Sequence, residues 1–164
     1  LAEAWRAAGM SDLARLAKVN DVALALQPSA ERHLETVMQG SAFVAAMSTA
    51  WPAPKQSAAI SALGEDISYP VAVGLFTAGH AIPLKPAALG YGIAFVGNLV
   101  SAAIRLSLIG QTDAQRITAG LLPHLDAAAR VAVHLTLDDL GSATLRSDLA
   151  SLAHETQYSR LFRS

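Results

Sequence analysis

The chain has no cysteine among its 164 residues. This absence excludes disulfides, thiolate nucleophiles and thiolate metal sites, and it leaves the cytoplasm as the default compartment. Charge is also sparse, because Asp, Glu, Lys and Arg together make up 15% of the residues and the formal net charge is −1. The chain has no basic stripe, which argues against nucleic acid as its main partner.

The sequence also lacks the common catalytic and metal-binding patterns. No two of its five histidines are three or four residues apart, the spacing that places two ligands on one helix face. No serine lies in a Gly-x-Ser-x-Gly elbow, and Gly90-Tyr91-Gly92 lacks the third glycine of a dinucleotide site. Asp138-Asp139 is typical of a solvated turn. We therefore predict a protein that is not an enzyme and holds no cofactor or metal of its own.

Apolar residues are abundant, at 52% of the chain. An uncharged run from Pro86 to Ile104 has apolar residues on every side of a helix, a pattern of protein cores and bilayers. Because the run is rich in Ala and Gly and contains Asn98 and Ser101, we predict a central apolar helix over about 85–108. The predicted fold is an all-α, single-domain helical bundle packed around it, spanning 1–164.

A membrane hairpin over 67–104 is the alternative interpretation of the same stretch, since residues 67–84 are also uncharged. The prolines between the two halves and His80 favour a bundle without membrane contact.

Capping residues predict further helices before this run. They begin at Ser11, Ser29 and Ser68, and a weaker helix covers Gln56–Leu63. Within them, Asn20 falls in an apolar stripe and needs a hydrogen-bonding partner. Gly40 lies in mid-helix, where we expect it to permit a close helix crossing.

After the run, Thr112 and Gln115 have the spacing of a capping box, which predicts a helix beginning there. This helix is expected to kink or break at Pro123 and to end near residues 134–137. A loop over 138–146 and a short helix capped by Ser147 then lead to a tail, so that 147–164 form a helix plus an interaction segment. No strand-like alternation is present.

The tail carries Tyr and Arg, the residue types that dominate binding hot spots. Leu161 and Phe162 need a place to be buried. From the residues alone, two interpretations stay open: the tail folds back onto its own bundle, or it docks on another protein.

The ending from Asp148 to Ser164 contains His-Glu-Thr-Gln-Tyr-Ser-Arg-Leu-Phe-Arg-Ser and closely resembles the C-terminus of the urease accessory protein F (UreF) family. Two inner segments are similar to the family as well: Tyr69–Gly74, and Arg105-Leu106 followed by Gly110–Arg116. The family's N-terminal portion, with its Ser-Phe-Pro-x-Gly-Gly-type segment, is absent from the sequence.

The resemblance implies an all-helical, dimer-forming assembly chaperone rather than an enzyme. UreF proteins bridge a D/H-type urease accessory protein and a G-type accessory GTPase in the cytoplasm. The complex inserts Ni²⁺ into apo-urease, and the F protein modulates GTP hydrolysis. Nickel and GTP are handled by the partner proteins.

The resemblance also implies partner-binding residues. Tyr158, Leu161 and Phe162 would be apolar anchors for the D/H-type partner, and Arg160 and Arg163 would donate charge-assisted hydrogen bonds. A second polar surface would hold the tail or face the GTPase, unless it is only a capping turn. The full set is His154, Glu155, Gln157, Tyr158, Arg160, Leu161, Phe162, Arg163, Arg105, Gln111, Asp113 and Arg116.

A different class of function also stays open. The bundle could instead be a small-molecule binding protein or an enzyme with an apolar interior pocket near His80.

Overall fold

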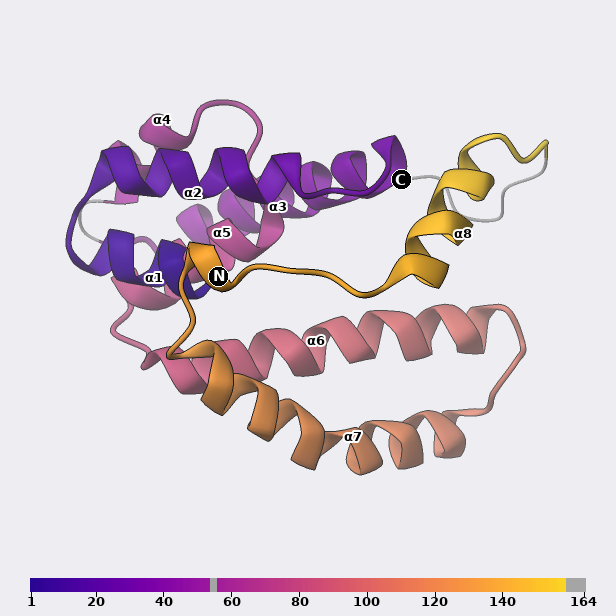
Figure 1. Cartoon of the computed structure of the whole chain (residues 1–164). Helices are drawn as coiled ribbons and strands as arrows, with labels where there is room; N and C mark the ends of the chain where they lie inside the picture. Colours follow the sequence, from indigo (N-terminus) through magenta and orange to yellow (C-terminus); the bar gives the residue numbers. More distant parts are fainter. Residues whose placement is uncertain (54–55, 159–164) are drawn as a thin grey trace.

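The computed structural model describes residues 1–53 and 56–158, and over these residues it contains helices and no strands. Figure 1 shows two parts, a cluster made by the earlier helices and a hairpin made by α6 and α7. The elements are α1 (Ala2–Gly9), α2 (Leu13–Ala25), α3 (Ala30–Ala50), α4 (Gln56–Leu63), α5 (Tyr69–Gly79), α6 (Leu84–Arg105), α7 (Gln111–Ala132), the 3₁₀ turn η1 (Leu137–Asp139) and α8 (Leu145–Glu155). The predicted all-α bundle is confirmed.

The centre of the bundle is α5, not the helix that was predicted there. Six consecutive residues of α5, from Val71 to Phe76, are buried. The helix packs against α1, α2, α3, α4 and α6, with α1 and α3 making the most extensive contacts. Phe76 is fully buried and meets Phe43 of α3 edge to face, with ring centroids 5.7 Å apart. The core therefore forms around a short helix of 11 residues.

The predicted central helix exists as α6, but its central, buried position was wrong. Only Ala87 and Val96 are buried among its residues. The helix lies along α7 and touches the rest of the bundle mainly near its own beginning (Figure 1). Apolar residues on all sides show that every face of the helix can be buried. How many faces are buried depends on how many other helices pack against it.

The membrane-hairpin interpretation is contradicted by α5, which would be its first half. That helix is short and is enclosed by other helices of the same chain. By length and composition, α6 is the one helix in the described part of the chain that could cross a bilayer, and 11% of its most apolar window is buried.

Several helix boundaries differ from the prediction. No helix is predicted over α1, whose first turn has no side-chain cap. The helix α7 begins at Gln111 with Gly110 as its N-cap, so the capping box predicted at Thr112 is wrong. The helix continues through Pro123 and bends near its middle (Figure 1). Finally, α8 begins at Leu145, two residues before the predicted cap at Ser147.

The contacts predicted for Asn20 and Gly40 are confirmed. Asn20 is buried, and its side-chain amide donates to the Asp66 carbonyl (2.7 Å) while its oxygen accepts from the Ser68 N–H (2.9 Å). At Gly40 the backbone of α3 crosses the segment that leads into α5. A Cβ atom there would lie 1.9 Å from the carbonyl oxygen of Ile67.

A charged cluster ties the segment after α7 to the beginning of the chain. Glu3 is buried and pairs with both Arg6 and Arg15. The Arg6 guanidinium also donates to the carbonyls of Val133 (2.6 Å) and Leu135 (2.8 Å). This cluster fixes where the chain leaves α7 and turns toward α8.

We expect Gly40→Ala to lower the free energy of unfolding by about 3 kcal/mol, because the new methyl group would overlap backbone atoms that cannot move aside. Gly90→Ala in α6 is the matched control. A Cβ at Gly90 meets nothing within 4 Å, so this variant should gain about 0.5–1 kcal/mol from helix propensity. Urea unfolding of both variants measures the difference, and equal stability of the two would contradict the close crossing.

The Glu3 cluster predicts a loss of stability in acid. Burial alone would raise the pKa of Glu3, but hydrogen bonds from Arg15 and Arg6 lower it overall. A carboxylate with a depressed pKa in the folded state stabilises the protein above its unfolded pKa of about 4.3, and this contribution is lost as the pH falls through the folded value.

We therefore expect the unfolding free energy of the wild type to fall below about pH 4.5 more steeply than that of Glu3→Gln. At neutral pH the variant should be less stable by about 2 kcal/mol, because two arginines lose a charged partner. Parallel slopes for the two proteins between pH 3 and 5 would contradict this role.

Candidate functional site

A stripe of leucines faces solvent along α8. Leu145, Leu149 and Leu152 are spaced by four and three residues, which places them on one face of the helix. Their side chains are 68%, 57% and 46% exposed, and none of the 11 residues of α8, all of which the structure describes, is buried. The helix thus presents its apolar face outward, the reverse of the usual orientation of a surface helix.

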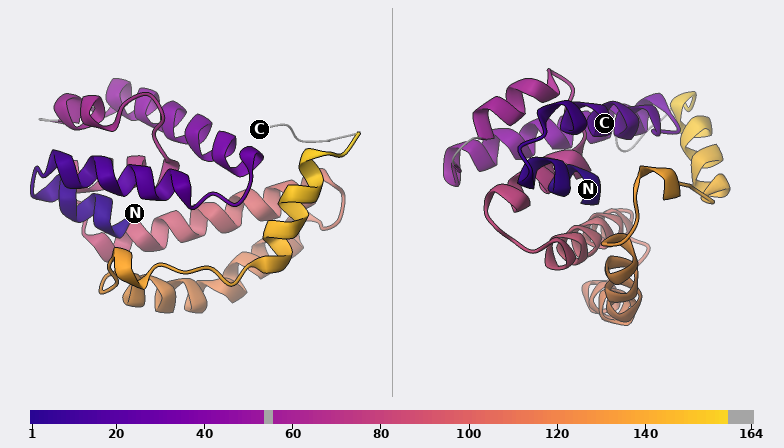
Figure 2. Two further views of the ribbon diagram at one scale, coloured as in Figure 1. Left: turned by 45° about the horizontal axis from the view of Figure 1, so that its top comes forward. Right: turned by 60° about the vertical axis from the view of Figure 1, so that its left-hand side comes forward.

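Polar contacts hold another face of α8 on the first turn of α3. The Ser151 and Ser29 hydroxyls are 2.6 Å apart, and a Glu155 carboxylate oxygen accepts from the first backbone N–H of α3 (2.7 Å). His154 Nδ1 lies 2.5 Å from a carboxylate oxygen of Glu31. Figure 2 shows α8 beside this end of α3. Two predicted partner-binding residues, His154 and Glu155, therefore contact their own bundle.

The chain beyond α8 leaves this contact. Gln157 is exposed, and the Tyr158 side chain has no cover from the described residues, with a relative exposure of 104%. The other predicted tail residues, Arg160, Leu161, Phe162 and Arg163, lie outside the described part of the chain.

The second group of predicted residues comes together at the turn between α6 and α7. Arg105 ends α6, Gln111 begins α7, and Asp113 pairs with Arg116 at 3.1 Å. All four are exposed. Among the described residues, the hydrogen bonds that hold α8 run to α3 and not to this turn.

The leucine stripe and the polar contacts between α8 and the first turn of α3 were not predicted from the sequence. The stripe had a readable signal, since leucines recur at helical spacing between Thr144 and His154. The contacts with α3 had no such signal, because Ser29 and Ser151 are 122 positions apart in the sequence.

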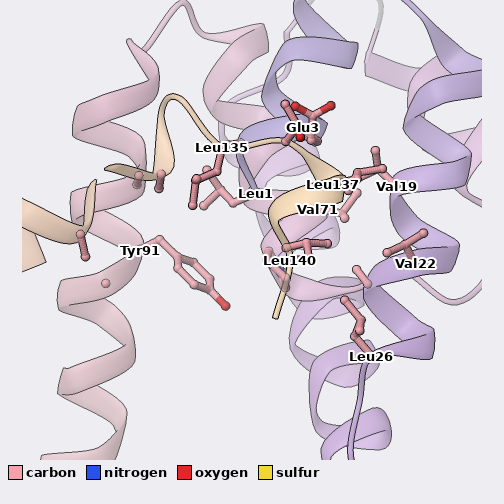
Figure 3. A pocket seen from close by; sticks show the side chains of 18 of the residues that line it. Leu1, Glu3, Val19, Val22, Leu26, Val71, Tyr91, Leu135, Leu137 and Leu140 are labelled. Atoms are coloured by element: carbon pink, nitrogen blue, oxygen red, sulfur yellow. The ribbon is translucent and has the colours of Figure 1, made fainter. Parts of the chain in front are cut away.

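An apolar cavity lies between the early helices and the α6–α7 hairpin. Its volume is about 430 Å³, and it is lined mainly by aliphatic side chains of α2, α5, α6, α7 and η1. Figure 3 shows the Tyr91 ring reaching into it from α6. Burial raises the pKa of Tyr91, so its hydroxyl stays protonated at neutral pH.

His80 does not line this cavity, nor the cavity of about 390 Å³ that includes its neighbour Gly79. Its Nε2 instead lies 3.0 Å from the carbonyl oxygen of Trp51. The pocket expected near His80 is therefore not formed around that side chain. In the described residues, no group of three or more His, Asp or Glu side chains is arranged to hold a metal ion.

The architecture is that of an all-helical bundle that displays an apolar helix on its surface. The UreF family model matches residues 1–122 of the chain. The urease accessory protein UreF of Xanthobacter autotrophicus is 54% identical over 99% of this chain and 67% of its own length. The UreF proteins of Rhodopseudomonas palustris strain BisA53 and of Methylobacterium radiotolerans are 52% and 49% identical, over 69% and 71% of their lengths. The chain belongs to the UreF family.

Proposed function

We propose that this chain acts in urease maturation as an assembly chaperone in the cytoplasm. In this role it bridges a D/H-type accessory protein and a G-type accessory GTPase, so that Ni²⁺ can be inserted into apo-urease. The chain modulates GTP hydrolysis without catalysing it, and its partners hold the nickel and the nucleotide. Its working form is a homodimer. The support is membership of the UreF family together with the exposed apolar surface of α8.

The outward leucine stripe of α8 is the observation that carries a docking role. An amphipathic helix that lays apolar residues at i, i+4 and i+7 into a groove is a recurrent mode of recognition between proteins. Leu145, Leu149 and Leu152 have this spacing and are not covered by the described residues of the chain. The D/H-type protein is the proposed owner of the groove.

The tail extends the same interface. Tyr158 offers a fully exposed ring, which is a typical hot-spot side chain. Gln157, Leu161 and Phe162 are proposed to join it. Arg160 and Arg163 are proposed as donors to carbonyl or carboxylate oxygens of the partner. His154 and Glu155 contact the first turn of α3, and these contacts support a role in holding α8 in place.

The α6–α7 turn is the proposed surface for the GTPase. It lies at the end of the α6–α7 hairpin, and it carries exposed polar side chains, including both charges, at Arg105, Gln111, Asp113 and Arg116. Such a surface suits a partner that binds and leaves during a GTP cycle, since exposed charges mainly influence association rates.

The test of the first surface is co-purification with the D/H-type protein. We expect Leu145→Gln plus Leu149→Gln to weaken binding at least tenfold, because each exposed leucine would lose its burial in the complex. Glutamine and leucine have similar helix propensities, so the helix should persist.

Met10→Gln is the matched control, since Met10 is an exposed apolar residue (60%) at the end of α1, far from α8 in sequence. Circular dichroism checks that all three proteins fold alike. If the folded double variant binds as tightly as the wild type, α8 is not the interface. If the wild type does not bind at all, the proposed function fails for this chain.

The second surface predicts a separable effect. We expect Gln111→Ala plus Arg116→Ala to change the GTP hydrolysis rate of the G-type protein in the assembled complex at least threefold. Affinity for the D/H-type protein should stay unchanged, because the turn and α8 are held by different contacts. A variant that loses the D/H-type protein while hydrolysis is unaltered would contradict this division.

A further inference from the structure

We propose that the first turn of α3 is a seat that fixes the orientation of α8, so that Ser29 and Glu31 are positioning residues for partner binding. This inference rests on the proposed docking role of α8. It concerns residues that no motif of the tail includes.

The argument begins with how weakly α8 is otherwise held. None of its residues is buried, so burial of apolar surface does not fix the helix against the bundle. Among the helices, α3 is its main packing neighbour. The chain before it is anchored at η1, where Leu137 packs on the core and Thr136 and Asp139 form a capping box. Every residue of the stretch 140–147 after this anchor is exposed.

The seat is built from complementary polar groups. The first turn of a helix has backbone N–H groups without helical partners and the positive end of the helix dipole. Glu155 places a carboxylate on the first of these N–H groups in α3. Ser29, the N-cap of α3, accepts from the Arg32 N–H (3.2 Å) and also meets Ser151.

The third contact joins a ring nitrogen to a carboxylate. His154 Nδ1 lies against the Glu31 carboxylate, with Glu31 in the first turn of α3 and His154 in the last turn of α8. The imidazole therefore also lies at the negative end of the α8 dipole, where a partial positive charge is stabilised.

The three seat contacts determine which face of α8 is displayed. Residues 151, 154 and 155 share one side of the helix at about 100° per residue. The leucines at 145, 149 and 152 are centred about 130° away around the helix. Because the polar side contacts α3, the leucine stripe faces away from α3, and its side chains are exposed. Holding a binding element in its bound orientation reduces the ordering that association requires, and so raises affinity.

One double variant removes contacts of the seat at positions outside the leucine stripe. We expect Glu31→Ala plus Ser151→Ala to raise amide hydrogen exchange about tenfold over 145–155 in the chain alone, while exchange in α5 stays unchanged. Affinity for the D/H-type protein should fall about tenfold, mainly through slower association. Glu35→Ala plus Ser147→Ala is the matched control, because it changes the same residue types on the same helices without a described contact between them.

A covalent variant tests the same claim in the opposite direction. Because the chain has no cysteine, Ser29→Cys plus Ser151→Cys provides a single pair of thiols where the two hydroxyls are 2.6 Å apart. The oxidised protein should bind the D/H-type partner at least as tightly as its reduced form.

The outcomes separate this inference from the proposed function. Loss of binding on oxidation would overturn the seat as a positioning device, since it would mean that α8 must leave α3 to bind. Unchanged exchange over 145–155 in the double alanine variant would also overturn it, whatever the partner does. If the wild type does not bind the D/H-type protein, the proposed function fails, whereas increased exchange in the variant would still support the seat.

Discussion

The fold depends on how the chain is held as it enters α5. Asn20 of α2 fixes the backbone on both sides of Ile67, and the Thr36 hydroxyl of α3 accepts from the Tyr69 N–H (3.2 Å). Gly40 lets the α3 backbone approach this same point without a side chain between them. Three helices therefore meet at one short segment, and the buried face of α5 follows from that meeting. The other α-helices contact α5 directly, except α7 and α8, which are placed through α6 and α3 respectively.

Much of this architecture could be predicted from local signals. The sequence predicts the helix over Ala30–Ala50 and its cap at Ser29, because both depend on neighbouring residues. It also predicts the hydrogen-bonded Asn20 and the close approach at Gly40, because each is a single unusual residue within a helix. Which helix occupies the centre of the bundle could not be predicted in the same way. The run in α6 and the run in α5 are both apolar and uncharged, and only the tertiary contacts decide that α5 is enclosed while α6 is covered along one side. Helix α1 was missed because its first turn has no side-chain cap.

In the candidate site, too, local features were predicted and long-range contacts were not. The tail motif and the resemblance it carries predict docking residues at His154 and beyond, and among these Tyr158 is exposed. The same motif also contains Glu155, whose partner in this chain is an N–H of α3, 125 positions away. No spacing rule connects such distant groups. A polar residue of the tail motif therefore holds α8 on its own bundle.

The most direct measurement of the central claim is site-specific photo-crosslinking in the complex with the D/H-type protein. A photoreactive side chain in place of Leu149 should crosslink to that partner, because the stripe faces outward from the bundle. The same group in place of the similarly exposed Leu99 of α6 (56%) should not. Crosslinks from the α6 position alone would contradict the account, since they would place the partner on the hairpin and leave α8 without a docking role.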